Sequence, residues 1–148
     1  RMVLAAGATL MYPNQNRLII DAGTCITYDF VNAENQYLGG AISPGIKIRY
    51  KSLNNYTSKL PLLTLSEDFE IIGNSTKSAI HSGVINGVIF EIEGFISQYS
   101  LKNQDLTIIL TGGDAEFLAK RLKSTIFANS NFLLESLNLL SLYTQKND

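Results

Sequence analysis

The sequence Ile20-Asp21-Ala22-Gly23-Thr24-Cys25-Ile26-Thr27 decides how the first half of the chain folds. Aliphatic residues at positions 18–20 lead into Asp21, and residues 24–31 are rich in β-branched and aromatic side chains, which is typical of a strand. The stretch therefore predicts a buried strand, a tight turn at Gly23 and a returning strand. Glycine has no Cβ, so its backbone can turn with positive φ and let a ligand come close.

Two interpretations of this turn are open from the residues alone. Exposed turn amides beside the Thr24 hydroxyl suit phosphate oxygens, and Asp21 at the end of a buried strand can hold a cation or an activated water. The first interpretation is a phosphate-and-cation site. In the second, Asp21 and Thr24 only satisfy the amides of a hairpin turn.

The composition narrows the class of protein. The chain has 148 residues, enough for one domain, with 45% apolar and 17% charged residues. A formal net charge of −1 gives no electrostatic reason to expect nucleic acid or an anionic membrane as a partner. Cys25 is the only cysteine, and neither a signal peptide nor an uncharged apolar run of about 18 residues is present. We expect a soluble cytoplasmic protein.

The first helix is expected over residues 2–12, where Pro13 ends it. No N-cap residue precedes it, so we expect that further sequence lies upstream of Arg1.

The segment from residue 36 to residue 60 is expected to pass from a strand into a helix. Gly39 and Gly40 mark a bulge or a close backbone approach. Ser43 is the predicted N-cap and Pro44 the first turn of a helix that reaches Leu60. Residues 62–73 are a predicted loop that borders a site.

The longest periodic segment, residues 75–98, predicts a helix with an apolar stripe at four-residue spacing. The stripe consists of Ile80, Val84, Val88, Ile92 and Phe95 or Ile96. Ala79, Gly83 and Gly87 form a second line, and each glycine costs about 1 kcal/mol of helix propensity. This cost indicates a packing role for the small residues, within the core or across a subunit interface.

Polar residues of this helix have simpler interpretations. Glu91 and Glu93 argue against a membrane span. His81, the only histidine, is interpreted as structural because no second histidine or cysteine lies near it in the sequence.

The last third of the chain contains a second glycine turn. A strand at residues 106–110 runs into Thr111-Gly112-Gly113-Asp114, and a helix follows at residues 115–122. Backbone amides could face a nucleotide here, although any strand–helix unit needs such a turn. Residues 131–134 are the predicted last strand, followed by a helix at residues 137–143. Alternating strands and helices predict an α/β fold with an antiparallel hairpin in its sheet.

Four segments, taken together, resemble type III pantothenate kinase, of the acetate-kinase, sugar-kinase, Hsp70 and actin superfamily, over residues 1–143. They are Asp21-Ala22-Gly23-Thr24, Gly39-Gly40-Ala41-Ile42-Ser43-Pro44-Gly45, Thr76-Lys77-Ser78-Ala79-Ile80-His81-Ser82-Gly83 and Thr111-Gly112-Gly113-Asp114. The resemblance implies a ribonuclease-H-like (actin-like ATPase) α/β fold, with a mixed sheet and flanking helices. It implies a homodimer that transfers the γ-phosphate of ATP to the 4′-hydroxyl of pantothenate, the first step of coenzyme A biosynthesis. The implied ions are Mg²⁺ with ATP and a monovalent cation, K⁺ or NH₄⁺.

The resemblance also implies a role for individual residues. Asp21 would bind the monovalent cation, Gly23, Thr24, Thr111, Gly112 and Gly113 would contact ATP, and Arg1 and Thr76 would contact pantothenate. Arg1 matches the last residue of the family's Gly-x-Asp-Arg motif, so the catalytic aspartate is expected just before it. Residues 1–148 are therefore expected to be the C-terminal portion of the kinase, inactive alone. Cys25, where the family often has alanine, is interpreted as a small buried apolar residue.

The chemistry of phosphoryl transfer agrees with this resemblance, because it depends on positioning and charge neutralisation rather than on a nucleophilic side chain. The chain has no Ser-His-Asp set, Cys-His pair or zinc-ligand spacing. Two alternatives remain: a non-catalytic regulatory relative, and another phosphotransferase of the same superfamily.

Overall fold

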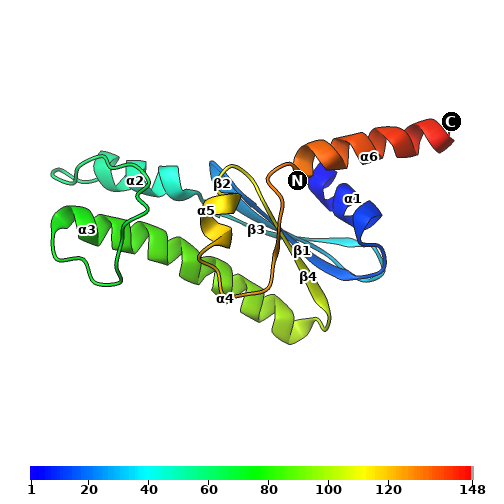
Figure 1. Ribbon diagram of the computed structural model, residues 1–148, viewed down its shortest axis with the longest axis horizontal. Helices are drawn as coiled ribbons and strands as arrows, with labels where there is room; N and C mark the ends of the chain where they lie inside the picture. The colour runs from blue at the N-terminus through cyan, green and yellow to red at the C-terminus, as the bar shows by residue number, and fades with distance from the viewer. Residues whose placement is uncertain (148) are drawn as a thin grey trace.

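A five-stranded mixed sheet lies between two layers of helices in the computed structural model, which describes residues 1–147 (Figure 1). The strands are β1 (Asn16–Ala22), β2 (Cys25–Val31), β3 (Tyr37–Pro44), β4 (Leu106–Thr111) and β5 (Phe127–Ala128), and their order in the sheet is β3-β2-β1-β4-β5. The central strand β1 is antiparallel to β2 and parallel to β4. The predicted hairpin around Gly23 is confirmed.

The helices are divided between the two faces of the sheet (Figure 1). One face carries α2 (Ile46–Asn55), α3 (Thr76–His81), α4 (Gly87–Lys102) and α5 (Ala115–Ala119), and the other carries α1 (Met2–Met11) and α6 (Phe132–Asn147). A π-helical turn, η1 (Ser82–Asn86), joins α3 to α4, so the three form one long helix. Successive side chains of β1 point to opposite faces of the sheet, so Leu18 and Ile20 face α4, whereas Ile19 faces α1.

The larger core forms between the long helix and the sheet. The predicted stripe is confirmed, since Ile80, Val84, Val88, Ile92 and Ile96 are all buried there. By length and composition, the helix over Thr76–Lys102 could also cross a membrane. Here, however, its apolar stripe is packed against the strands.

The smaller core joins the two ends of the chain. Leu4, Ala8 and Phe132 are buried between α1, α6 and the sheet. The helices touch at Gly7, where an added Cβ would overlap the side chain of Ser136. Helix α6 is thus held by close backbone approach as well as by apolar burial.

The predicted helix start at Ser43 is wrong. Ser43 and Pro44 are the last residues of β3, and α2 begins at Ile46 with Gly45 as its N-cap. The pairing of Pro44 with Cys25 extends the sheet to this point, so strand pairing prevails over the capping signal. The Ser43 hydroxyl donates instead to Glu91 Oε1, at 2.5 Å.

The predicted strand at residues 131–134 is also wrong, because these residues begin α6. The Asn129 amide donates to the Leu110 carbonyl at 2.8 Å and closes the sheet edge there. Its side-chain oxygen then accepts from the Asn131 amide at 3.0 Å, which starts the helix. The strand at this edge is the shorter β5.

Candidate functional site

Two glycine turns meet at the carboxyl ends of β1 and β4. Asp21 and Thr111 are partners in the parallel register, and the Asp114 amide donates to the Ala22 carbonyl at 3.0 Å. Gly112 has a φ of 99°, and an added Cβ would overlap that same carbonyl. Only glycine fits this position, so the two turns predicted from sequence to contact ATP are packed together as one unit.

The space beside Gly23 and Gly113, one glycine in each turn, is open. Ideal Cβ atoms on Gly23 and Gly113 would have no neighbouring atom within 4 Å. The Gly23 amide is already used, because it donates to the Cys25 carbonyl at 3.0 Å within the hairpin turn. Within residues 1–147, no backbone hydrogen bond of the loops or turns uses the amides of Thr24 or Gly113. These two amides and the exposed Thr24 side chain are therefore the donors available to a phosphate.

Asp21 is a half-buried carboxylate whose oxygens make no hydrogen bond among the described residues. Burial raises the pKa of Asp21, and the charge of Asp29 raises it further. An unpartnered carboxylate beside two backbone turns suits a weakly hydrated cation. No group of three or more His, Cys, Asp and Glu residues that could hold a metal ion gathers within residues 1–147.

A buried carboxylate on the same face of the sheet holds Arg1. Asp29 is fully buried, and its Oδ1 lies 2.9 Å from Arg1 Nε and 2.7 Å from Arg1 Nη2. The Tyr37 hydroxyl donates to the same oxygen at 2.7 Å. The pKa of Arg1 is raised, mainly by its hydrogen bond to Asp29. Arg1 is thus fixed over the sheet by a charge-assisted pair.

Sequence reasoning did not single out Asp29 or Tyr37. The signal was the alternation along β2, because Ile26 and Tyr28 face the larger core and Asp29 must therefore face the other side. The same alternation corrects a second interpretation: Cys25 is exposed rather than buried, since it too points away from the larger core.

Thr76 lies apart from these residues. It is the first residue of α3, directly after the Ser75 capping box. Helix α3 lies beside α2, at the end of the molecule away from α1 and Arg1 (Figure 1). One chain therefore does not bring together the two side chains predicted to contact pantothenate.

His81 has a partner that fits its structural interpretation. The Tyr50 hydroxyl lies 2.7 Å from His81 Nδ1, and burial raises the pKa of Tyr50 to about 12. The pair joins α2 to α3.

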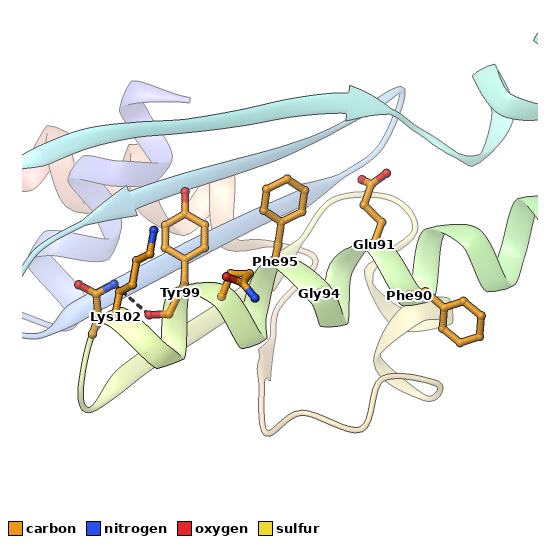
Figure 2. A pocket seen from close by; sticks show the side chains of 8 residues that line it. Phe90, Glu91, Gly94, Phe95, Tyr99 and Lys102 are labelled. Atoms are coloured by element: carbon orange, nitrogen blue, oxygen red, sulfur yellow. Dashed lines mark hydrogen bonds between the residues drawn. The ribbon is translucent and has the colours of Figure 1, made fainter.

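An open groove of about 600 Å³ lies along α4, away from the glycine turns. In Figure 2, Glu91, Phe95 and Tyr99 project from α4 toward the strands. Glu91 Oε1 accepts hydrogen bonds from Tyr28 Oη at 2.9 Å and from Ser43 Oγ, while Arg49 Nη2 lies 2.5 Å from its Oε2. Burial raises the pKa of Glu91, but these hydrogen bonds outweigh burial and hold it below the usual value.

Comparison with known structures defines the class of fold. A Campylobacter jejuni protein described as a Baf family transcriptional activator aligns with a TM-score of 0.68 at 22% identity, over 97% of this chain and 65% of that one. The ethanolamine utilization protein EutJ from Carboxydothermus hydrogenoformans aligns with a TM-score of 0.51 at 18% identity, over 90% of this chain and 50% of that one. With the observed sheet, these likenesses show the ribonuclease-H-like (actin-like ATPase) α/β fold predicted from sequence.

Comparison of sequences gives the family. The family model for type III pantothenate kinase matches residues 1–98. The type III pantothenate kinase of Flavobacterium johnsoniae is 65% identical over all of this chain, which covers 61% of that protein, and that of Cytophaga hutchinsonii is 43% identical over 97% of this chain and 61% of that protein. The chain belongs to the type III pantothenate kinase family and spans about three fifths of these relatives.

Proposed function

We propose that the protein containing this chain transfers the γ-phosphate of ATP to the 4′-hydroxyl of pantothenate, the first step of coenzyme A biosynthesis. The chain would form the C-terminal portion of that kinase. The family match supports this function, and so does the joining of two glycine turns by the bond from Asp114 to Ala22.

In this proposal the glycine turns hold ATP. Gly23, Thr24, Thr111, Gly112 and Gly113 line the phosphate and nucleoside end of the site, and Mg²⁺ is carried by the phosphates. Asp21 holds K⁺ or NH₄⁺ beside them, which offsets the negative charge of the triphosphate. The unpartnered state of the Asp21 carboxylate and the open space at Gly23 and Gly113 support these roles.

Pantothenate would be held by Arg1, and Thr76, at the opposite end of the same folded chain, would reach it only from the second subunit of the proposed dimer. The pairing of Arg1 with the buried Asp29 supports a fixed guanidinium, which is suited to a substrate carboxylate. The general base would be an aspartate directly before Arg1, so residues 1–148 alone would lack the group that accepts the hydroxyl proton.

We also propose a cytoplasmic homodimer. Among residues 1–147, no atom lies within 4 Å of an ideal Cβ on Gly83, and the one neighbour of a Cβ on Gly87 is the Arg49 guanidinium at 4.0 Å. Packing within one chain therefore gives no reason for Gly83 and Gly87, which leaves a subunit interface as their role, whereas Ala79 is approached closely by Gly73 of the same chain.

The test is a phosphorylation assay of the full-length protein with ATP and pantothenate, in potassium and in sodium. We expect rapid turnover in potassium and little in sodium. Equal rates in both salts would overturn the role of Asp21. Turnover of another acceptor, with none of pantothenate, would instead identify a different phosphotransferase of the superfamily.

A further inference from the structure

Glu91 connects the long helix to the corner between β3 and α2. Its carboxylate accepts from Ser43 Oγ, at the end of β3, and from Arg49 Nη2, in α2, each at 2.5 Å. The side chains of Glu91 and Arg49 are only 24% and 21% exposed, so solvent screens this ion pair less than a surface pair.

The same corner rests directly on the first glycine turn. Arg49 Nε donates to the Pro44 carbonyl at 2.8 Å, and the next residue, Gly45, donates its amide to the Thr24 carbonyl at 3.0 Å. An added Cβ on Gly45 would overlap the carbonyls of Gly23 and Thr24. No side chain separates the corner from the turn, so a displacement of the corner would displace the turn.

We propose that Glu91 is a positioning residue for the Gly23–Thr24 turn. It holds Ser43 and Arg49, and these hold the Pro44–Gly45 corner against the turn. The inference rests on the proposed function, because it takes ATP phosphates to be what this turn binds. Glu91 does not touch the nucleotide; it acts by keeping the turn amides aimed at the phosphates.

Glu93 provides a matched control on the same helix. Its carboxylate accepts from the amides of Lys123 and Ser124 and from the Ser124 hydroxyl. Glu93 is thus a partly buried, hydrogen-bonded carboxylate like Glu91, but it ties down the segment after α5 instead of the Pro44–Gly45 corner.

The test compares Glu91→Gln, Glu91→Ala and Glu93→Gln in the full-length protein. Glu91→Gln keeps an acceptor for Ser43 but loses the charge facing Arg49. We expect the Kd for ATP, measured by calorimetry, to rise about fivefold to tenfold in Glu91→Gln and further in Glu91→Ala. The KM for pantothenate should stay within about twofold, and Glu93→Gln should bind ATP as the wild type does.

Hydrogen exchange gives a readout that does not depend on activity. The Gly45 amide should exchange faster in Glu91→Ala than in Glu93→Gln at equal overall stability, because its bond to the Thr24 carbonyl loosens. An Arg49→Gln/Glu91→Gln double variant should bind ATP about as well as Glu91→Gln alone, since both changes break the same link.

Several outcomes would overturn the inference. Wild-type ATP affinity in both Glu91 variants would do so, and so would an equal loss in Glu93→Gln. A wild-type protein that binds no ATP would overturn the inference and the proposed function together. A protein that binds ATP but does not phosphorylate pantothenate would overturn only the proposed function, because the ATP affinities of the variants still test Glu91.

Discussion

Asp21 and Gly112 approach each other so closely that a Cβ on Gly112 would lie 2.6 Å from Asp21 Oδ1. Gly112 therefore forms part of the wall around the carboxylate that is proposed to hold a monovalent cation. The proposed cation site and the second glycine turn are in contact, so a substitution in the turn should also alter the position of the Asp21 carboxylate.

The first prediction concerns the two neighbouring glycines of this turn. Gly112→Ala should lower the free energy of unfolding by about 2 kcal/mol or more, because Gly112 has positive φ and no room for a methyl group. Gly113→Ala should change it by less than about 1 kcal/mol, since the space beside Gly113 is open. Urea unfolding curves measure both.

The variants Gly112→Ala and Gly113→Ala also distinguish an effect on stability from an effect on ATP binding. Although Gly113→Ala should fold normally, its methyl group would point into the space proposed for the nucleotide, so ATP affinity should fall. If Gly113→Ala binds ATP as tightly as the wild type, the nucleotide does not lie against this turn.

The second prediction is a pH effect at Asp21. Burial raises the pKa of Asp21 in the folded protein, so stability falls as the pH rises from the unfolded pKa to the folded pKa, and the full cost of ionising this group is present above the folded pKa. That cost disappears below the unfolded pKa of about 3.9, where the carboxyl is protonated in both states. Asp21→Asn should therefore raise the melting temperature by a few degrees at pH 7 in sodium, with no gain near pH 3.5.

The effect of potassium on the melting temperature should also differ between the wild type and Asp21→Asn. Bound potassium should stabilise the wild type but not Asp21→Asn, and the wild type should lose this response as the pH falls through the raised pKa. A variant that melts lower than the wild type at pH 7 in sodium would contradict the prediction.

The third prediction concerns Arg1 and Asp29. Arg1→Met should cost about 1–3 kcal/mol of stability, because it leaves the fully buried Asp29 carboxylate without its charged partner. Tyr37→Phe removes one hydrogen bond to Asp29 and should cost about 1 kcal/mol. Adding Asp29→Asn to Arg1→Met should recover part of the loss, as chemical denaturation would show. A double variant less stable than Arg1→Met would mean that the charge of Asp29 is satisfied by other groups.

The fourth prediction tests the homodimer. Gly83 is exposed and an added Cβ there meets no atom within 4 Å among residues 1–147, so Gly83→Leu should give a folded protein. If two chains meet at this face, the new side chain should convert the full-length dimer to a monomer by light scattering. Ser100→Leu, at an exposed position of the same helix, should leave the mass unchanged. A dimer that survives Gly83→Leu would place the interface elsewhere.

The elements that were predicted correctly have local signals. The alternation and turn residues around Gly23 predicted the hairpin, and the four-residue spacing from Ile80 to Ile92 predicted the long helix and its buried stripe. The turn at Gly112 and Gly113 was predicted as well, but its contact with Ala22 depends on the parallel register of two strands far apart in the sequence.

The errors arise where a distant partner decides the structure. The local sequence predicts Ser43 as a helix N-cap, but in the structure its hydroxyl donates to Glu91, 48 residues further along the chain. Residues 131–134 read as a strand because nothing in their own sequence indicates that Phe132 is buried against α1. The buried interpretation of Cys25 came from the absence of groups nearby in the sequence that would activate a thiol, whereas the alternation along β2 places Cys25 on the exposed side.

The contact between Gly7 and Ser136 has a consequence for synthesis on the ribosome. The second core is not complete until α6 has left the exit tunnel, since α6 covers the side of α1 that faces away from the strands. A nascent chain must leave the α6-facing side of α1 uncovered while residues 12–131 are translated. A premature stop codon before residue 132 would therefore leave that side of α1 uncovered, and its product would be a substrate for chaperones and proteases.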